Sequence, residues 1–83
     1  MREPTVKDKV FEIVSRVMDV PVEQLNEESS PDTIKNWDSL QHMSLVLALE
    51  EDFNIMFSDT EIIELLSIEL IIEIISLHLA NPS

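Results

Sequence analysis

The sequence predicts an all-α fold, a small four-helix bundle with a long first loop and a short third helix. Its hydrophobic residues recur three and four positions apart, as on one face of a helix, instead of alternating as in a strand. With 83 residues, the chain is long enough for one small domain, residues 1–83. It contains no glycine and no cysteine, which excludes glycine-rich phosphate loops, disulfides and thiolate chemistry.

The first helix is expected to begin after Thr5, a suitable N-cap residue with Asp8 in the first turn. It should end before Pro21, because a proline ring forces the preceding residue into extended geometry. Its apolar stripe comprises Val6, Val10, Ile13, Val14, Val17 and Met18. This stripe is expected to be plain core.

Residues 19–37 form the longest connection, since Pro21, Pro31 and the polar residues 26–30 argue against a helix there. A loop of this length in a small domain needs anchors. We expect the spaced apolar residues to hold it against the bundle: Val22, Leu25, Ile34 and Trp37. Trp37, the only tryptophan, should pack the base of the loop instead of binding a cofactor.

The second helix should open at Asp38, whose carboxylate can cap the amides of the first turn, with Gln41 completing a capping box. Ser39 then takes the first helical position, beside the positive end of the helix. Because Asp38 supplies the cap, the Ser39 side chain is not needed to cap the helix. It is either a solvated serine or an attachment point. Within this helix, Leu40, Met43 and Leu47 share one face, and Leu45, Val46, Leu49 and Phe53 share the next.

The chain after Phe53 predicts two more helices. Ile55 and Phe57 should plug a short connection, and the spacing from Ser58 to Glu61 is a capping box for a helix from about Asp59 to Leu65. Ser67 can cap a last helix, about Ile68 to Leu79. That helix has more apolar residues than one face can hold, so either it is deeply buried or the surplus lines a space for an apolar ligand or a protein contact.

The charge is strongly acidic, with 17 acidic and 5 basic residues and a net charge of −12. All the bases lie in residues 2–35. Such a surface repels nucleic acids and anionic lipids and attracts basic protein patches, although it could serve solubility alone. The apolar residues 62–80 are interrupted by Glu64, Glu69 and Glu73, and the N-terminus lacks a signal-peptide core. We therefore expect a cytoplasmic monomer that binds neither membranes nor nucleic acids.

Catalysis and metal binding have weak support. Ser39 and His42 could form a nucleophile pair on one exposed helix face, but the sequence offers no oxyanion hole and no orienting acid. His42 and His78 lack zinc-ligand spacing, and the acids around Asn54 lack the glycine and glutamate of an EF-hand loop. Weak binding of divalent cations to clustered carboxylates is the one form of metal binding that the sequence still allows. We expect no enzyme and no metal site.

The residues Asp38-Ser39-Leu40, followed by L-V-L-A-L-E-E-D-F at positions 45–53, resemble the central helix of acyl carrier proteins. The resemblance extends from about Val6 to Leu79. It implies that Ser39 carries 4′-phosphopantetheine, moved from coenzyme A by a phosphopantetheinyl transferase with Mg²⁺, and that Asp38 supports this step. The arm would hold acyl groups as thioesters for acyl-loading and acyl-transferring enzymes of fatty-acid, polyketide or specialised lipid or glycan biosynthesis.

The resemblance also implies a docking face. Leu40, Met43 and Leu47 would form its apolar part, and basic patches on partners would meet these acids: Glu50, Glu51, Asp59, Glu61 and Glu64. Two positions depart from the family pattern: the departure at Asn36 indicates a specialised branch, and the one at Ser44 argues against docking to the fatty-acid enzymes. Ser44 stands where the fatty-acid carriers usually have an acid, and Asn36 stands where glycine is frequent, although asparagine tolerates left-handed backbone. An aminoacyl or peptidyl carrier, and an acidic helical adaptor without a prosthetic group, are the alternatives.

Overall fold

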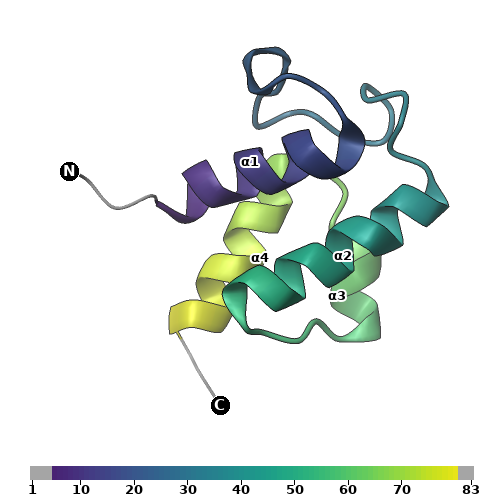
Figure 1. The fold of residues 1–83 in the computed structure, drawn as a ribbon. Coiled ribbons are helices and arrows are strands. Elements are labelled where there is room, and N and C mark those ends of the chain that lie inside the picture. The colour runs from purple at the N-terminus through teal and green to yellow at the C-terminus, as the bar shows by residue number, and fades with distance from the viewer. Residues whose placement is uncertain (1–4, 81–83) are drawn as a thin grey trace.

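The computed structural model describes residues 5–80, which contain four α-helices and no strand (Figure 1). The helices are α1 (Val6–Met18), α2 (Ser39–Phe53), α3 (Asp59–Glu64) and α4 (Ile68–Ala80), with one 3₁₀ turn, η1 (Val22–Gln24). Helices α1 and α2 run in opposite directions, and α4 crosses behind them (Figure 1). The all-α prediction is confirmed, with α3 ending one residue earlier and α4 one residue later than expected.

Local capping explains where the helices begin. The Thr5 hydroxyl accepts from the Asp8 amide at 3.1 Å, and the Asp8 carboxylate accepts from the Thr5 amide, which completes a capping box. Ser58 and Glu61 form the same box on α3. Because the chain has no glycine, the left-handed residues that end α1 and α2 are Asp19 (φ 57°) and Asn54 (φ 56°). These residue types enter that region at lower cost than most.

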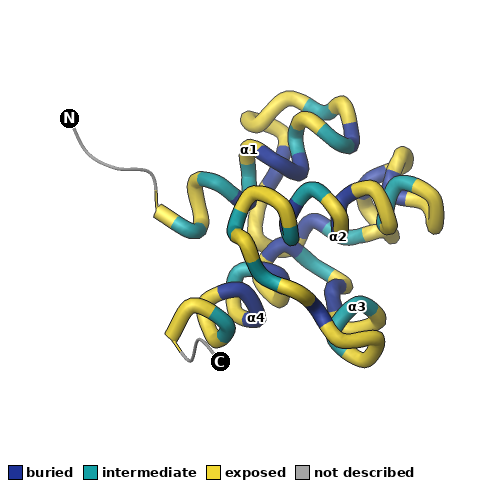
Figure 2. The backbone as a smooth tube through the Cα atoms, turned by 60° about the horizontal axis from the view of Figure 1, so that its bottom comes forward, coloured by how far each residue is buried: buried dark blue, intermediate teal, exposed yellow. Residues whose placement is uncertain are grey.

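The core lies between α1 and the two helices that pack against it, α2 and α4, and buried residues are interspersed with exposed ones along these three helices (Figure 2). The predicted stripe of α1 is confirmed, with Val10 and Val14 fully buried and Val6 and Val17 half-buried. The other side chains without accessible surface are Met18, Leu45, Leu49, Leu65, Ile68, Ile71 and Ile75. The buried hydrophobic side chains within residues 5–80 form one cluster.

Helix α4 is buried along one face only. Its isoleucines Ile71 and Ile75 have no accessible surface, whereas Leu70, Leu77 and Leu79 are 37%, 64% and 45% exposed. Part of the apolar surplus of this helix therefore lies on the surface. Among residues 5–80, no helix has both the length and the apolar character needed to cross a membrane.

The long connection between α1 and α2 is held by three of its four predicted anchors. Leu25 and Ile34 are 8% exposed and Trp37 is 3% exposed. Val22 was predicted to be the fourth, and this is wrong, because it lies in η1 and is 47% exposed. The 3₁₀ turn directs its side chain to solvent while Leu25, at the end of the turn, enters the core.

Backbone hydrogen bonds tie the same connection to the start of α4. The amide of Ile68 donates to the Ser29 carbonyl and the amide of Glu69 to the Glu27 carbonyl, both at 3.0 Å. These bonds satisfy donors that a helix leaves unpaired in its first turn. The loop is therefore ordered by contacts with a helix that is remote in sequence.

Two amide side chains, one in this connection and one on α2, bond to the end of α1. Asn36 Nδ2 donates to the Met18 carbonyl at 2.8 Å, and Gln41 Nε2 donates to the Val17 carbonyl at 3.3 Å. Gln41 thus reaches across to α1, and the capping box predicted for it on α2 is wrong. The left-handed backbone considered for Asn36 is also absent, since only Asp19 and Asn54 have positive φ among the described residues.

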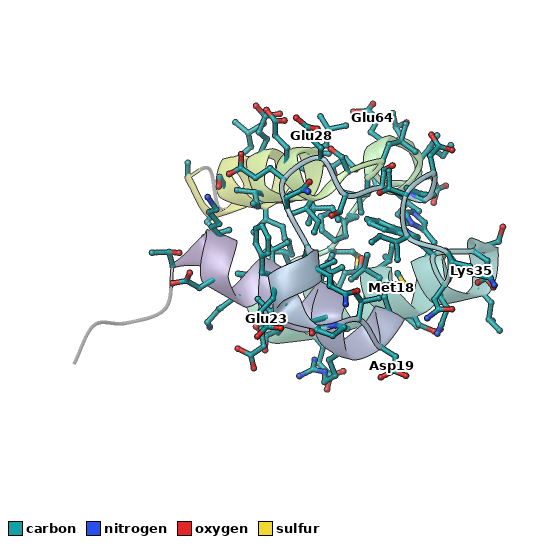
Figure 3. All side chains as sticks on the ribbon, turned by 90° about the horizontal axis from the view of Figure 1, so that it is seen from above. Met18, Asp19, Glu23, Glu28, Lys35 and Glu64 are labelled. Atoms are coloured by element: carbon teal, nitrogen blue, oxygen red, sulfur yellow. The ribbon has the colours of Figure 1, made fainter. Side chains whose placement is uncertain are left out.

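Acidic side chains project from opposite sides of the molecule. Glu28 and Glu64 point to one side and Asp19 and Glu23 to the other (Figure 3). The acidic surface is therefore wider than the flank of α2.

Candidate functional site

The first turn of α2 presents a serine hydroxyl to solvent. Asp38 has extended backbone (φ −98°, ψ −175°), and its Oδ1 accepts from the Gln41 amide at 2.9 Å, so the predicted cap is confirmed. Ser39 is the first residue of the helix and is exposed. Its hydroxyl has no hydrogen-bond partner in residues 5–80. The hydroxyl therefore stands free at the positive end of the α2 dipole.

Trp37 and His42 lie on either side of this serine in sequence and are bonded to each other. The indole Nε1–H of Trp37 donates to His42 Nδ1 at 2.9 Å, and the two rings stack with their centroids 6.2 Å apart. Because a buried indole N–H needs an acceptor, this bond explains how Trp37 is tolerated at the base of the loop. The prediction that Trp37 is a packing residue is confirmed.

The second ring nitrogen of His42 contacts α3. Its Nδ1 accepts from Trp37, so a neutral ring carries its proton on Nε2, and that atom donates to the Ile62 carbonyl at 2.9 Å. With both nitrogens engaged, the half-buried ring of His42 is not on an exposed face with Ser39, as the nucleophile pair would require. His42 instead bridges α2 and α3.

A shallow groove of about 380 Å³ lies beside Ser39. It is formed by the end of the long connection, the first turn of α2 and the α3 segment. Its lining residues are Pro31, Trp37, Asp38, Ser39, His42, Met43, Ile62, Ile63 and Leu66. Sequence reasoning did not find the contribution of residues 62–66. The available signal was Ile63 and Leu66, apolar residues outside the helical stripe, which are 72% and 55% exposed.

The predicted apolar docking residues share an outward surface of α2. Leu40 is 76% exposed, Met43 46% and Leu47 62%, while Leu45 and Leu49 are fully buried. The division of this helix into two faces is therefore as the sequence predicts. An exposed leucine pair beside a free hydroxyl is a suitable surface for transient protein contact.

The predicted acidic docking residues divide into two groups. Glu51, Asp59 and Glu64 are exposed. Glu50 Oε2 accepts from the Phe57 amide at 2.8 Å and thereby holds the connection between α2 and α3.

Glu61 also has internal partners. Its carboxylate accepts from the Ser58 amide at 2.9 Å and lies 3.0 Å from His78 Nε2. The hydrogen bond from the Ser58 backbone, with a smaller contribution from His78, lowers the pKa of Glu61 below its ordinary value. His78 in turn packs edge-on against Phe57. Glu61 therefore joins the start of α3 to the end of α4.

No group of three or more histidine, cysteine, aspartate or glutamate side chains within residues 5–80 is arranged to hold a metal ion. The reactive group at the first turn of α2 is the exposed Ser39 hydroxyl. An exposed hydroxyl at a helix N-terminus suits a phosphodiester, because the helix end favours a bound anion.

Comparison with known proteins identifies the family. A family model described as "Phosphopantetheine attachment site" matches residues 8–75. The chain is 34% identical over 59 residues to acyl carrier protein 3 of Ralstonia nicotianae, covering 71% of this chain and 68% of that protein. It is 33% identical over 61 residues to the acyl carrier protein of Chlorobium phaeovibrioides, covering 74% and 78% respectively. The chain belongs to the acyl carrier proteins, which hold covalent 4′-phosphopantetheine and act as carriers, not as enzymes.

Proposed function

We propose that Ser39 is the attachment point of 4′-phosphopantetheine and that the protein presents acyl groups on this arm to enzymes of fatty-acid, polyketide or specialised lipid or glycan biosynthesis. The observation that carries the proposal is the free Ser39 hydroxyl at the start of α2, where Asp38 already supplies the cap. A helix N-terminus stabilises the negative phosphate that attachment introduces.

Several other hydroxyls of the described chain are occupied or placed differently. Thr5, Ser58 and Ser67 cap helices, and Ser29 is buried and accepts from the Asn26 amide. Ser44 is exposed but lies inside α2, where backbone amides are already bonded within the helix. Ser44 is therefore a matched control for Ser39.

Attachment requires the Ser39 hydroxyl, coenzyme A and one partner enzyme, the transferase. Ser39 Oγ forms a bond to the pantetheine-bearing phosphorus of coenzyme A, the diphosphate bond breaks, adenosine bisphosphate leaves and the serine proton passes to a base of the transferase. Asp38 uses Oδ1 for the cap. Its other carboxylate oxygen would be available to support the Mg²⁺ that the transferase brings. Once attached, the arm supplies a thiol that holds acyl groups as thioesters.

Docking uses the exposed surface next to Ser39. Leu40, Met43 and Leu47 supply apolar contact, and the exposed acids Glu51, Asp59 and Glu64 attract basic partner residues. Glu50 and Glu61 contribute negative charge while keeping their internal hydrogen bonds. Contacts of this kind are weak and screened by salt, which suits a carrier that must release each partner. We expect a cytoplasmic monomer.

Intact-mass measurement tests the attachment. The protein is incubated with coenzyme A, Mg²⁺ and a phosphopantetheinyl transferase, together with Ser39→Ala and Ser44→Ala variants. The wild type and Ser44→Ala should each gain one phosphopantetheine, and Ser39→Ala should gain none. Modification of Ser39→Ala would refute the assignment of Ser39, and an unmodified wild type would favour the acidic adaptor. The thioester recovered from protein isolated from its own cell distinguishes an acyl from an aminoacyl or peptidyl cargo.

A further inference from the structure

Two residues that line the groove beside Ser39 are joined by a hydrogen bond between two helices. His42 on α2 and Ile62 on α3 both line the groove, and His42 Nε2–H donates to the Ile62 carbonyl at 2.9 Å. We call this bond the latch. The Ile62 carbonyl also accepts from the Leu65 amide at 3.4 Å, so the latch strengthens the end of a helix of only six residues.

The latch is held in one state by Trp37. The indole N–H donates to His42 Nδ1, which keeps the proton of a neutral ring on Nε2, where it can donate to Ile62. Trp37 is 3% exposed and stacks on the imidazole ring, so the ring cannot rotate without leaving a buried indole donor unpaired. Trp37, at the end of the loop before Ser39, therefore fixes the orientation of the ring that bonds to α3.

Beyond the latch the molecule is closely packed. Residues three apart on a helix share a face, so the next turn of α2 from His42 presents Leu45. Leu65 immediately follows the end of α3, and its amide donates to the Ile62 carbonyl. Both leucines have no accessible surface. The latch thus stands at the boundary between the open groove and the core, and an apolar group could pass inward only by separating α2 from α3.

We propose that His42 is a specificity-determining residue that keeps the cargo on the Ser39 arm in the surface groove and thereby favours short acyl groups. This inference rests on the proposed attachment at Ser39. Ser39 itself lines the groove, so the groove is apolar surface directly beside the start of the arm. Its volume, about 380 Å³, lies near the lower end of small-molecule pockets, which measure about 300–1,000 Å³. A longer acyl group buries no additional methylene groups while the bond between His42 and Ile62 is intact.

Thermal unfolding of loaded proteins tests the latch. A broadly tolerant transferase loads the wild type from acetyl-, hexanoyl- and dodecanoyl-coenzyme A, and intact mass verifies each product. In the wild type, Tm relative to the unacylated arm-bearing form should rise from acetyl to hexanoyl and then stay within about 1 °C for dodecanoyl. In His42→Ala, dodecanoyl should exceed hexanoyl by about 5 °C or more, because the opened entrance lets additional methylenes be buried.

Two further variants sharpen the comparison. His42→Gln retains one acceptor and one donor in the side chain and should keep the wild-type plateau. Trp37→Phe removes the donor that orients the ring and should show an intermediate rise, which provides a second measurement if His42→Ala does not fold. In the wild type, hexanoyl loading should also shift the emission of Trp37, because this single tryptophan lines the groove.

The outcomes separate the two proposals. Absence of loading on wild-type Ser39 refutes the proposed function. Loading with a Tm that climbs steadily to dodecanoyl in the wild type refutes the latch and leaves the attachment site intact. An equal plateau in the wild type, His42→Ala and Trp37→Phe also refutes the latch, because the limit on chain length would then have another origin.

Discussion

Replacing His42 with alanine is expected to lower the free energy of unfolding by about 2–4 kcal/mol. The variant loses the net contribution of the bond to the Ile62 carbonyl, about 1 kcal/mol. It also leaves the Trp37 indole N–H without its acceptor in a residue that is 3% exposed, which costs about 1–3 kcal/mol. Because both rings line the groove, removal of the imidazole lets water approach the indole in the variant, and this favours the lower end of the range.

This loss is large for so small a protein. At about 0.05–0.15 kcal/mol per residue, a chain of 83 residues has a total stability of roughly 4–12 kcal/mol. Urea unfolding followed by far-ultraviolet circular dichroism measures the change. Ser44→Ala, an exposed change on the same helix, should stay within about 0.5 kcal/mol of the wild type.

A double-mutant cycle isolates the bond between the two rings. His42→Ala, Trp37→Phe and the double variant should give a coupling energy of about 1 kcal/mol, since residues in direct contact are not additive. A His42→Ala variant as stable as Ser44→Ala would contradict the reasoning. So would strict additivity in the cycle, since it would mean that the Trp37–His42 bond contributes nothing in solution.

Three other predictions concern stability. Because the pKa of Glu61 is lowered in the folded protein, the stability that its carboxylate contributes is present above the ordinary pKa of 4.5 and is lost as pH falls through the folded pKa. Glu61→Gln should therefore flatten the decline of Tm below about pH 4.5. An unchanged decline would argue against the Ser58 and His78 contacts. Leu65→Ala should lower the free energy of unfolding by about 2–5 kcal/mol in denaturant unfolding, because Leu65 has no accessible surface. Leu66→Ala should cost far less, since Leu66 is 55% exposed. Equal losses would contradict the assignment of Leu65 to the core and Leu66 to the surface. Added NaCl or Mg²⁺ should raise Tm because the net charge of −12 is self-repelling, and a Tm independent of salt would show that the acids are too widely spaced to interact.

Much of the fold follows from features that act within a few residues. Thr5, Asp38 and Ser58 cap their helices through bonds to amides three positions away, so the helix starts can be predicted from short stretches of sequence. The helical period likewise separates exposed Leu47 from buried Leu49. The free hydroxyl of Ser39 follows from the same logic, because the neighbouring aspartate supplies the cap.

The tertiary structure decided which distant groups meet. Gln41 fits a capping box locally but donates to the Val17 carbonyl, 24 residues away. His42 resembles an exposed partner for Ser39 in sequence, yet its ring nitrogens are bonded to Trp37 and to Ile62 of α3. Local pattern determines which face of a helix a residue occupies, whereas the partner depends on how the helices pack, and this packing places the latch and the groove beside Ser39.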